Sequence, residues 1–280
     1  NIYLLSSVDY SDVDVLEYSD TTYSIMTLTI QPSQAQSIHW NLLADKVIDM
    51  NHNIQVRIAT LTTLTHAQEL VFSNIDFDVG AYTIRSSTTS SRIAFEQCTF
   101  TSSVSKGQPV LSINGAEELR LSMCQVQNVQ ITSTSPLIQV QDGLGLTIEY
   151  TTFLGCAIQS DSFAIDFTTS MPYRVDVTVY NVNVDPGYSF LHVASNISPW
   201  TDTQLSVTIL GCQFNGVGSI VLSQIQNVLV KNTAFDYCVA TTNTLGSNAC
   251  FNVSKAITTT FNTVTSKGFD QSPGKSFFGG

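Results

Sequence analysis

Eight segments of eight residues repeat one pattern of apolar and polar positions along the chain. Each octet begins with an apolar residue, most have a second apolar residue at the third position, and the eighth position is always Phe or Val. The octets begin at Leu70, Ile93, Leu119, Leu146, Val175, Val207, Val228 and Ile257. The seven steps from the first start to the last span 187 residues, a mean near 27. A drifting period in the twenties is typical of a solenoid whose loops vary in length.

A second, shorter apolar segment returns between successive octets. These segments lie at 110–113, 137–140, 163–167, 190–193 and 220–223. Short strands of this kind, joined by turns rich in Ser, Thr, Asn, Asp and Gly, predict an all-β parallel β-helix with two or three strands per coil. We expect about eight or more coils in one continuous elongated domain over residues 61–280, preceded by N-terminal strands and a cap region over residues 1–60.

The eighth position of the octet should form an interior column. Side chains alternate along a strand, and stacked coils lie about 4.8 Å apart, so equivalent apolar residues would pack on one another. The seventh position, which is mostly polar, would then form an outer ladder. The expected interior column is Phe77, Phe100, Val126, Phe153, Val182, Phe214, Phe235 and Val264.

The first 24 residues are acidic, with tyrosines between the carboxylates. The acidic residues are Asp9, Asp12, Asp14, Glu17 and Asp20. Calcium binds several carboxylate oxygens, but this stretch lacks the Gly and the terminal Glu of a recognised calcium loop. We therefore interpret it as a solvated acidic edge or a cap over the first coil, and calcium is the one cofactor that the sequence leaves open.

Composition excludes two classes of partner. The net charge is −11, the isoelectric point is near 4.5 and only 12% of residues are charged, so there is no basic stripe to displace counterions from nucleic acid. No apolar run approaches the ~20 residues that span a bilayer. We expect neither a nucleic-acid partner nor a membrane span.

Six cysteines permit up to three disulfides. Cys98 and Cys124 share the sixth position of adjacent octets, where stacking brings Cα atoms into disulfide range. The alternative for this pair is two reduced thiols packed as small apolar groups. Cys238 and Cys250 flank an inserted loop, and there the sequence favours a disulfide across the loop.

Two sequons, at Asn196 and Asn252, would accept N-glycans in a secreted protein. Together with the cysteines they predict an extracellular location, either secreted or at the cell surface. The chain begins at Asn1 rather than Met, which we interpret as a processed or truncated product. Near its other end, Phe277 and Phe278 would belong to the cut edge of a longer chain, to an end cap, or to a strand that docks on the next molecule.

Octets such as LTIEYTTF from Leu146 and VLVKNTAF from Val228, each with a second apolar strand nearby, resemble the right-handed parallel β-helix proteins of the pectin-lyase-like superfamily. The resemblance is one of repeat pattern and covers about residues 60–270. It implies the right-handed form of the fold. The superfamily includes polysaccharide lyases, polygalacturonases and pectin methylesterases, and also surface proteins, adhesins and fibre components without catalysis, so the fold alone does not imply a reaction.

The enzymatic motifs of that superfamily are not found. Polygalacturonases carry Asn-Thr-Asp, whereas the Asn-Thr pairs here lead to Ala234, Leu245 and Val264. The methylesterase Gln-Asp-Thr is interrupted by Gly143, and no Arg-x-Pro of a pectate lyase occurs. Glycoside hydrolysis needs two carboxylates at a set separation. Candidate pairs are Asp76 with Asp78, Asp161 with Asp166, and Asp176 with Asp185. The histidines, His39, His52, His66 and His192, lie in separate segments without metal-ligand spacing.

The sequence therefore favours a non-catalytic extracellular structural or surface protein without cofactor. Such a chain would be a subunit of a filament or matrix that associates end to end through the open edges of its β-helix. The alternative is a carbohydrate-active enzyme, a polysaccharide lyase or hydrolase, or a carbohydrate-binding module that uses a groove on the β-helix, with glycans as partners.

Overall fold

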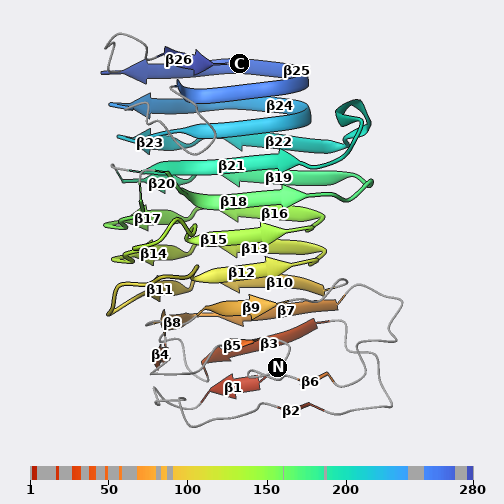
Figure 1. Ribbon diagram of the computed structural model, residues 1–280. Coiled ribbons are helices and arrows are strands. Elements are labelled where there is room, and N and C mark those ends of the chain that lie inside the picture. The colour runs from red at the N-terminus through yellow and green to blue at the C-terminus, as the bar shows by residue number, and fades with distance from the viewer. Residues whose placement is uncertain are drawn as a thin grey trace.

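The computed structural model is a rod of stacked β-coils (Figure 1). It describes residues 68–79, 83–86, 91–159, 161–185, 188–238, 249–268 and 276–279, with six short stretches before residue 60 (2–4, 17–18, 27–32, 38–41, 48–49 and 57–58). Every strand pairing is parallel, and each strand pairs mainly with the strand three places further along the chain. The prediction of an all-β parallel β-helix is confirmed.

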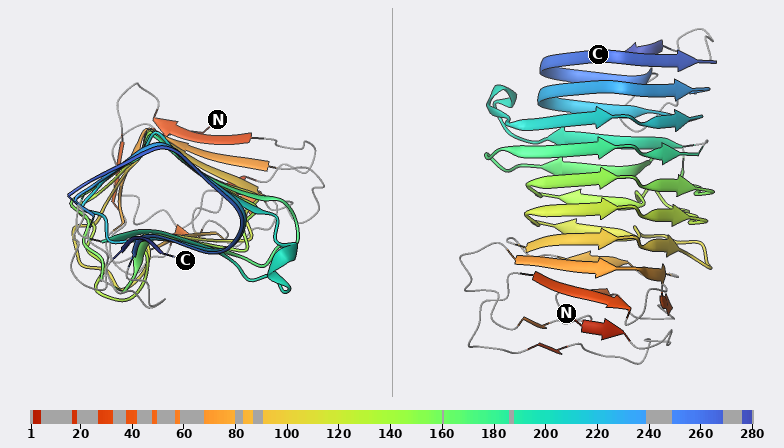
Figure 2. Two further views of the ribbon diagram at one scale, coloured as in Figure 1. Left: turned by 90° about the horizontal axis from the view of Figure 1, so that it is seen from above. Right: turned by 180° about the vertical axis from the view of Figure 1, so that it is seen from behind.

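Each coil contributes one strand to each of three faces, which give the rod its three-sided cross-section (Figure 2). Face A comprises β7 (Gln68–Ser73), β10 (Ser91–Glu96), β13 (Glu118–Ser122), β16 (Gly145–Glu149), β19 (Val175–Tyr180) and β22 (Leu205–Leu210). Face B comprises β8 (Ile75–Asp78), β11 (Thr99–Thr101), β14 (Gln125–Gln127), β17 (Thr152–Leu154), β20 (Asn183–Val184) and β23 (Gln213–Asn215). Face C comprises β9 (Ile84–Ser86), β12 (Leu111–Asn114), β15 (Ile138–Gln141), β18 (Phe163–Thr169), β21 (Ser189–Ser195) and β26 (Ser276–Gly279).

The last two long strands run through all three faces in turn. They are β24 (Ile220–Asp236) and β25 (Ala249–Lys267), and each crosses face C, then face A, then face B. The second apolar segments predicted from the sequence are the face C strands: Leu111, Ile138, Ile165, Leu191 and Ile220 lie in one register column.

The described N-terminal strands are β1 (Ile2–Leu4), β2 (Glu17–Tyr18), β3 (Thr27–Pro32), β4 (Ile38–Asn41), β5 (Ile48–Asp49) and β6 (Arg57–Ile58). Four of these six strands continue the same ladders. Strand β3 pairs with β7, β4 with β8 and β5 with β9, while β1 pairs with β3. Strands β2 and β6 form a separate two-stranded sheet. In the described residues, the backbone of the expected cap region therefore extends all three faces.

The turn from face A to face B is a stack of left-handed residues. From β7 onward, one residue at this turn in each successive coil has φ between 48° and 67°: Asn74, Gln97, Met123, Tyr150, Asn181, Gly211, Asn232 and Thr263. Side chains other than glycine rarely adopt this conformation. Here the turn is held by the next coil, since the N–H of Gln97 donates to the carbonyl of Ser122 at 2.9 Å, and the same bond recurs from coil to coil.

Apolar columns fill the interior. The residue in register with Phe95, the third residue of its octet, is buried in seven successive coils: Phe72, Phe95, Leu121, Ile148, Val179, Ile209 and Val230. Phe72 stacks on Phe95 with ring centroids 5.1 Å apart, and Phe77 stacks on Phe100 at 5.2 Å. Burying such side chains stabilises the fold by about 1.5–3 kcal/mol each.

Two octets predicted from the sequence are out of register by two residues. Leu146 pairs with Val177 rather than Val175, and Val228 pairs with Thr259 rather than Ile257. The eighth position is therefore Val184 in the first case and Ser266 in the second, so the interior column ends in a serine. A two-residue slip keeps every side chain on its face, so alternation along the sequence does not reveal it.

Candidate functional site

The end of the rod formed by β25 is open on one side. Strand β25 pairs with β24 along most of its length, but on its other side only Ala249, Phe251 and Asn252 pair with β26. No strand in the described part of the chain pairs with that side of β25 from residue 253 to residue 267 (Figure 1). Such an edge presents backbone N–H and C=O groups that can template a further strand.

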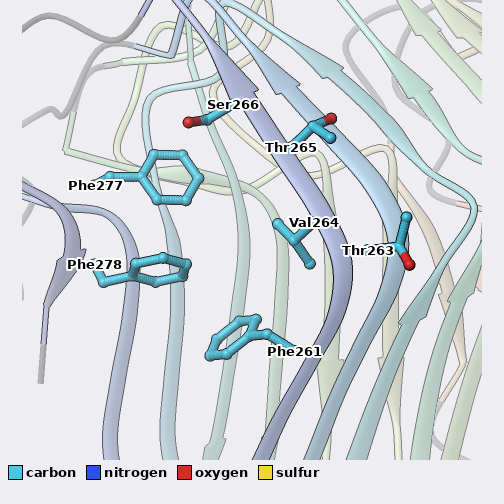
Figure 3. Close-up of a pocket in the computed structure, with 7 residues that line it drawn as sticks. All are labelled: Phe261, Thr263, Val264, Thr265, Ser266, Phe277 and Phe278. Carbon is cyan, nitrogen blue, oxygen red and sulfur yellow. The ribbon is translucent and has the colours of Figure 1, made fainter.

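A depression opens at the same end, where the interior of the last coil is not covered. Its volume is about 380 Å³ (Figure 3). Its lining residues, which we call the aromatic mouth, are Phe261, Thr263, Val264, Thr265, Ser266, Phe277 and Phe278. The Phe261 ring lies 4.9 Å from Phe278, and Phe278 lies 4.6 Å from Phe277, measured between centroids. All seven side chains are aromatic, aliphatic or hydroxylic, so the mouth suits apolar contact combined with strand pairing.

The sequence placed Phe261 incorrectly. Phe261 is the fifth residue of the octet predicted from Ile257, whereas the register puts it at the third position, in the column of Val230. Phe261 is 39% exposed and Phe278 is 51% exposed, although the equivalent residue one coil earlier is fully buried. The interior packing surface of the β-helix is thus partly open to solvent at this end.

The terminal coil also carries positive charge. Lys255 and Lys267 are exposed, and no Asp or Glu occurs between residues 249 and 268. The Nζ atom of Lys267 lies 5.6 Å from the centroid of the Tyr237 ring, one coil below. This coil is therefore basic within a chain whose net charge is −11.

Ion pairs and tyrosines occupy the outer surface of face A. Arg120 donates two hydrogen bonds to Oε1 of Glu149, at 3.0 and 2.5 Å, which raise the pKa of Arg120 and lower the pKa of the Glu149 carboxyl. Beside this pair, the rings of Tyr150 and Tyr180 meet edge to face at 5.1 Å, and Tyr150 is 51% exposed. The side of the rod thus offers one aromatic pair next to a bidentate ion pair.

The structure brings one acidic residue together with a histidine. Nδ1 of His192 lies 2.8 Å from Oδ1 of Asp166 on the outside of face C, and the His192 ring stacks on Phe163 at 5.3 Å. Asp161 precedes β18, whose outer surface carries Asp166.

The other carboxylate candidates are arranged differently. Asp176 is on face A, where Arg174 donates to it at 2.8 Å, whereas Asp185 follows β20 on face B. The pair Asp176 and Asp185 is therefore divided between two faces. Asp76 and Asp78 both lie on the outer side of β8 on face B, where they alternate with the buried residues Ile75 and Phe77.

Few of the other candidates for metal binding can be placed. In the described residues, no group of three or more His, Cys, Asp and Glu side chains could hold a metal ion. His39 is placed in β4 by its backbone alone. His52, His66 and the acidic stretch, apart from the backbone of Glu17 in β2, lie outside the described residues. The interpretation of that stretch as an acidic edge or cap, with calcium left open, therefore stays a prediction.

All six cysteines are described, and all are buried free thiols. Cys98 and Cys124 do share one column, as predicted, but no disulfide joins them. Each thiol instead donates to a carbonyl of the preceding coil: Cys98 Sγ to Phe72 O at 3.5 Å and Cys124 Sγ to Phe95 O at 3.2 Å. In-register residues on parallel strands are about 4.8 Å apart, and a disulfide prefers Cβ atoms 3.5–4.5 Å apart, so stacking favours the packed thiols.

The bridge expected between Cys238 and Cys250 is not formed in this structure either. A hydrogen bond to Cys250 lowers the pKa of the Cys238 thiol, so the two side chains are neighbours. By contrast, burial raises the pKa of the Cys156 and Cys212 thiols to about 11.

The two sequons lie in different surroundings. Asn196 is exposed and directly follows β21. Asn252 is half-buried within β25, on the outside of face C. An oligosaccharide therefore has free access to the first asparagine and only partial access to the second.

One buried lysine was not anticipated from the sequence. Lys106 is 0% exposed, and its backbone forms an isolated parallel bridge to Ile131. Burial lowers the pKa of Lys106 to about 8, an effect that nearby Asp78 partly offsets. The residue lies in a turn without a recognisable motif, which is why the octet pattern does not reveal it.

Comparisons with known proteins add no family. No protein-family model, no curated protein and no solved structure matches this chain. No helix in the described residues is long and apolar enough to cross a membrane.

Proposed function

We propose that this chain is a non-catalytic structural or surface protein that forms filaments or a matrix by end-to-end association. The observation that carries the proposal is the edge of β25 from residue 253 to residue 267, which pairs with no described strand on that side and lies directly beside the aromatic mouth. A strand that joined this edge would add a backbone ladder and cover the exposed rings of Phe261 and Phe278 in one contact.

The geometry of such a contact explains why it would yield filaments. A contact between the two different ends of a rod is heterologous, and heterologous contacts that do not close into a ring continue indefinitely. Because the ladders of this rod run along its axis, each added molecule would present the same open end to the next. The strength of the assembly would come from the backbone pairing, and the aromatic mouth would supply apolar burial.

An extracellular location forms part of the same proposal. In an oxidising compartment Asn196 would carry an N-glycan, because it is exposed at the end of a strand. Cys238 and Cys250 would pair there, since their thiols already contact one another across the inserted loop. Pairing would release two protons and pass two electrons to a disulfide oxidant such as a protein disulfide isomerase.

The test is the sedimentation velocity of the purified chain over a hundredfold concentration range, with negative-stain electron microscopy of the same samples. Native protein should form rods that lengthen with concentration. Phe261→Lys should abolish this, because a charged side chain in the interior column of an edge strand opposes stacking. The matched control is Leu229→Lys, since Leu229 is 37% exposed but lies one coil inside the edge, and it should still assemble. Native protein that remained monomeric throughout the range would refute the proposal.

A second candidate is the binding of carbohydrate along the side of the rod. The observation that favours it is the exposed Tyr150 ring with its partner Tyr180, next to the ion pair of Arg120 and Glu149. Aromatic faces beside charged hydrogen-bonding groups are suited to sugar rings. The measurement is binding to, and product release from, a panel of polysaccharides with and without calcium. Tyr150→Ala should lose binding if this candidate is correct, and Tyr173→Ala, which removes another exposed ring, is the control.

A further inference from the structure

Two tyrosines from adjacent coils meet on the outside of the rod, where face A turns into face B. The N–H of Tyr150 donates to the carbonyl of Tyr180 at 2.9 Å, and the two ring centroids lie 5.1 Å apart with the ring planes at 80°. Aromatic pairs prefer such an edge-to-face arrangement. Tyr150 is 51% exposed, and Tyr180, the last residue of β19, is half-buried. A reagent in solution can therefore reach two phenol rings that are already in contact.

The hydroxyl groups of the two rings are also neighbours. A side-chain hydrogen bond with Tyr180 is the main cause that raises the pKa of Tyr150, and a hydrogen bond with the side chain of Asn181 acts in the opposite direction. Asn181 is itself held by the next coil, because its N–H donates to the carbonyl of Leu210 at 2.9 Å. Since the two hydroxyls bond to one another, the ring carbons beside them are close as well.

Among the tyrosine side chains that the structure describes, no other two rings are in contact. Tyr173 is 63% exposed and Tyr237 is 53% exposed. The neighbour of the Tyr237 ring is Lys267, whose Nζ atom lies 5.6 Å from the ring centroid. Tyr188 is buried. Solvent access and contact between two phenol rings therefore coincide at one place in the described part of the rod.

Two phenol rings in contact can be joined by oxidation. Each ring first loses one electron and the proton of its hydroxyl, which gives two phenoxyl radicals. The radicals couple through the carbons next to the oxygens, and the hydrogens on those carbons then move to the oxygens and restore both hydroxyls. One hydrogen peroxide accepts the two electrons and two protons and becomes two molecules of water. The net change in the protein is one new carbon–carbon bond and the loss of two hydrogen atoms.

We propose that Tyr150 and Tyr180 form an oxidative modification site, at which a haem peroxidase and hydrogen peroxide join the two rings into a dityrosine. The new bond links two successive coils through their side chains, in addition to the backbone ladder between β16 and β19. A covalent link of this kind restricts the unfolded chain and so stabilises the fold, as a disulfide does. The proposal goes beyond end-to-end association, because the site lies within a single rod.

The test is treatment of the native chain with a haem peroxidase and hydrogen peroxide, at a concentration where the chain is monomeric. We expect the monomer to gain the blue fluorescence of dityrosine, and digestion to release a cross-linked peptide pair that has lost two hydrogen atoms. Tyr150→Phe and Tyr180→Phe keep the ring but remove the hydroxyl from which the radical forms, so each should reduce this fluorescence severalfold. The matched control is Tyr173→Phe, which removes an exposed tyrosine outside the pair and should leave the fluorescence unchanged.

The outcomes are read on the monomer, so they are independent of end-to-end association. Coupling within one molecule should proceed at a rate that does not depend on protein concentration. Equal fluorescence of the native monomer and of Tyr180→Phe would overturn the proposal. Cross-linked peptides that join other tyrosines, while both residues of the pair stay unmodified, would overturn it as well. As a second measurement, the oxidised native chain should unfold at a higher urea concentration than the untreated chain, and oxidised Tyr180→Phe should show no such increase.

Discussion

Phe261 lies in the same interior column as Val230, one coil further along the rod, yet Val230 is fully buried and 39% of Phe261 is exposed. The two residues have the same structural role and differ only in whether another coil covers them. At this end of the rod, side chains of the interior columns are therefore exposed to solvent.

This difference predicts unequal costs for the same substitution. Phe95→Ala removes a fully buried ring from the column and should lower the free energy of unfolding by about 3–5 kcal/mol. Phe261→Ala, at the partly exposed end, should cost the monomer less than about half of that. Urea unfolding of both variants at low concentration gives the two values. Equal costs would mean that Phe261 is covered in solution.

The close approach of Gly211 to Asn181 in the stack of left-handed turns predicts that a side chain at Gly211 destabilises the protein. Its φ is +67°, and a Cβ atom there would collide with Oδ1 of Asn181 in the preceding coil. Gly211→Ala should destabilise the protein by about 1–3 kcal/mol. The control is Gly107→Ala, where a Cβ atom meets nothing within 4 Å and φ lies outside the left-handed region. That change should be neutral or slightly stabilising, as measured by the midpoint of chemical unfolding.

The buried thiols predict a clear result in thiol titration. In the folded protein under reducing conditions, Ellman's reagent should react with none of the six cysteines within minutes, because all are buried and burial raises the pKa of Cys156 and Cys212 to about 11. All six should react after unfolding in urea. Rapid reaction of Cys98 or Cys124 in the folded state would contradict the thiol packing described above.

Lys106 predicts a pH dependence of stability. Its pKa falls from an ordinary value of 10.5 to about 8 on folding, so between these values the unfolded chain binds the extra proton. The contribution of Lys106 to the free energy of unfolding therefore rises as pH increases above about 8. At about pH 10 the increase is on the order of 2 kcal/mol. Below about pH 8 the lysine is charged in both states and the burial cost is present in full.

Lys106→Met should remove this rise, and Lys231→Met, at an exposed lysine, should keep it. The measurement is urea unfolding at several pH values, expressed as the difference between each variant and the native chain. Taking the difference cancels the opposite trend from thiols whose pKa is raised on folding, which lose stability as pH rises through about 9 to 11. Parallel curves for the native chain and Lys106→Met would contradict the assignment.

The sequence predicted the solenoid because the apolar octets are local and repeated. It also placed Cys98 and Cys124 in one column correctly, since position in the octet decides the column. It could not decide whether the thiols bond to one another, because that depends on the separation of side chains between coils. Phe261 was missed as part of the site because the apolar Ile257 fits the first position of the octet, whereas the register gives that position to the polar Thr259, two residues later on the same face.

Because the coils stack in register, the length of the rod can change in steps of one coil. Leu119 and Leu146 are equivalent positions one coil apart, so removing residues 119–145 would excise one complete turn and join two strands that already share a column. The rod would become shorter by about 4.8 Å, while both of its ends would stay as they are. The number of coils therefore sets the distance between the two ends of the rod. Duplication or loss of whole coils would change that distance without changing the residues at either end.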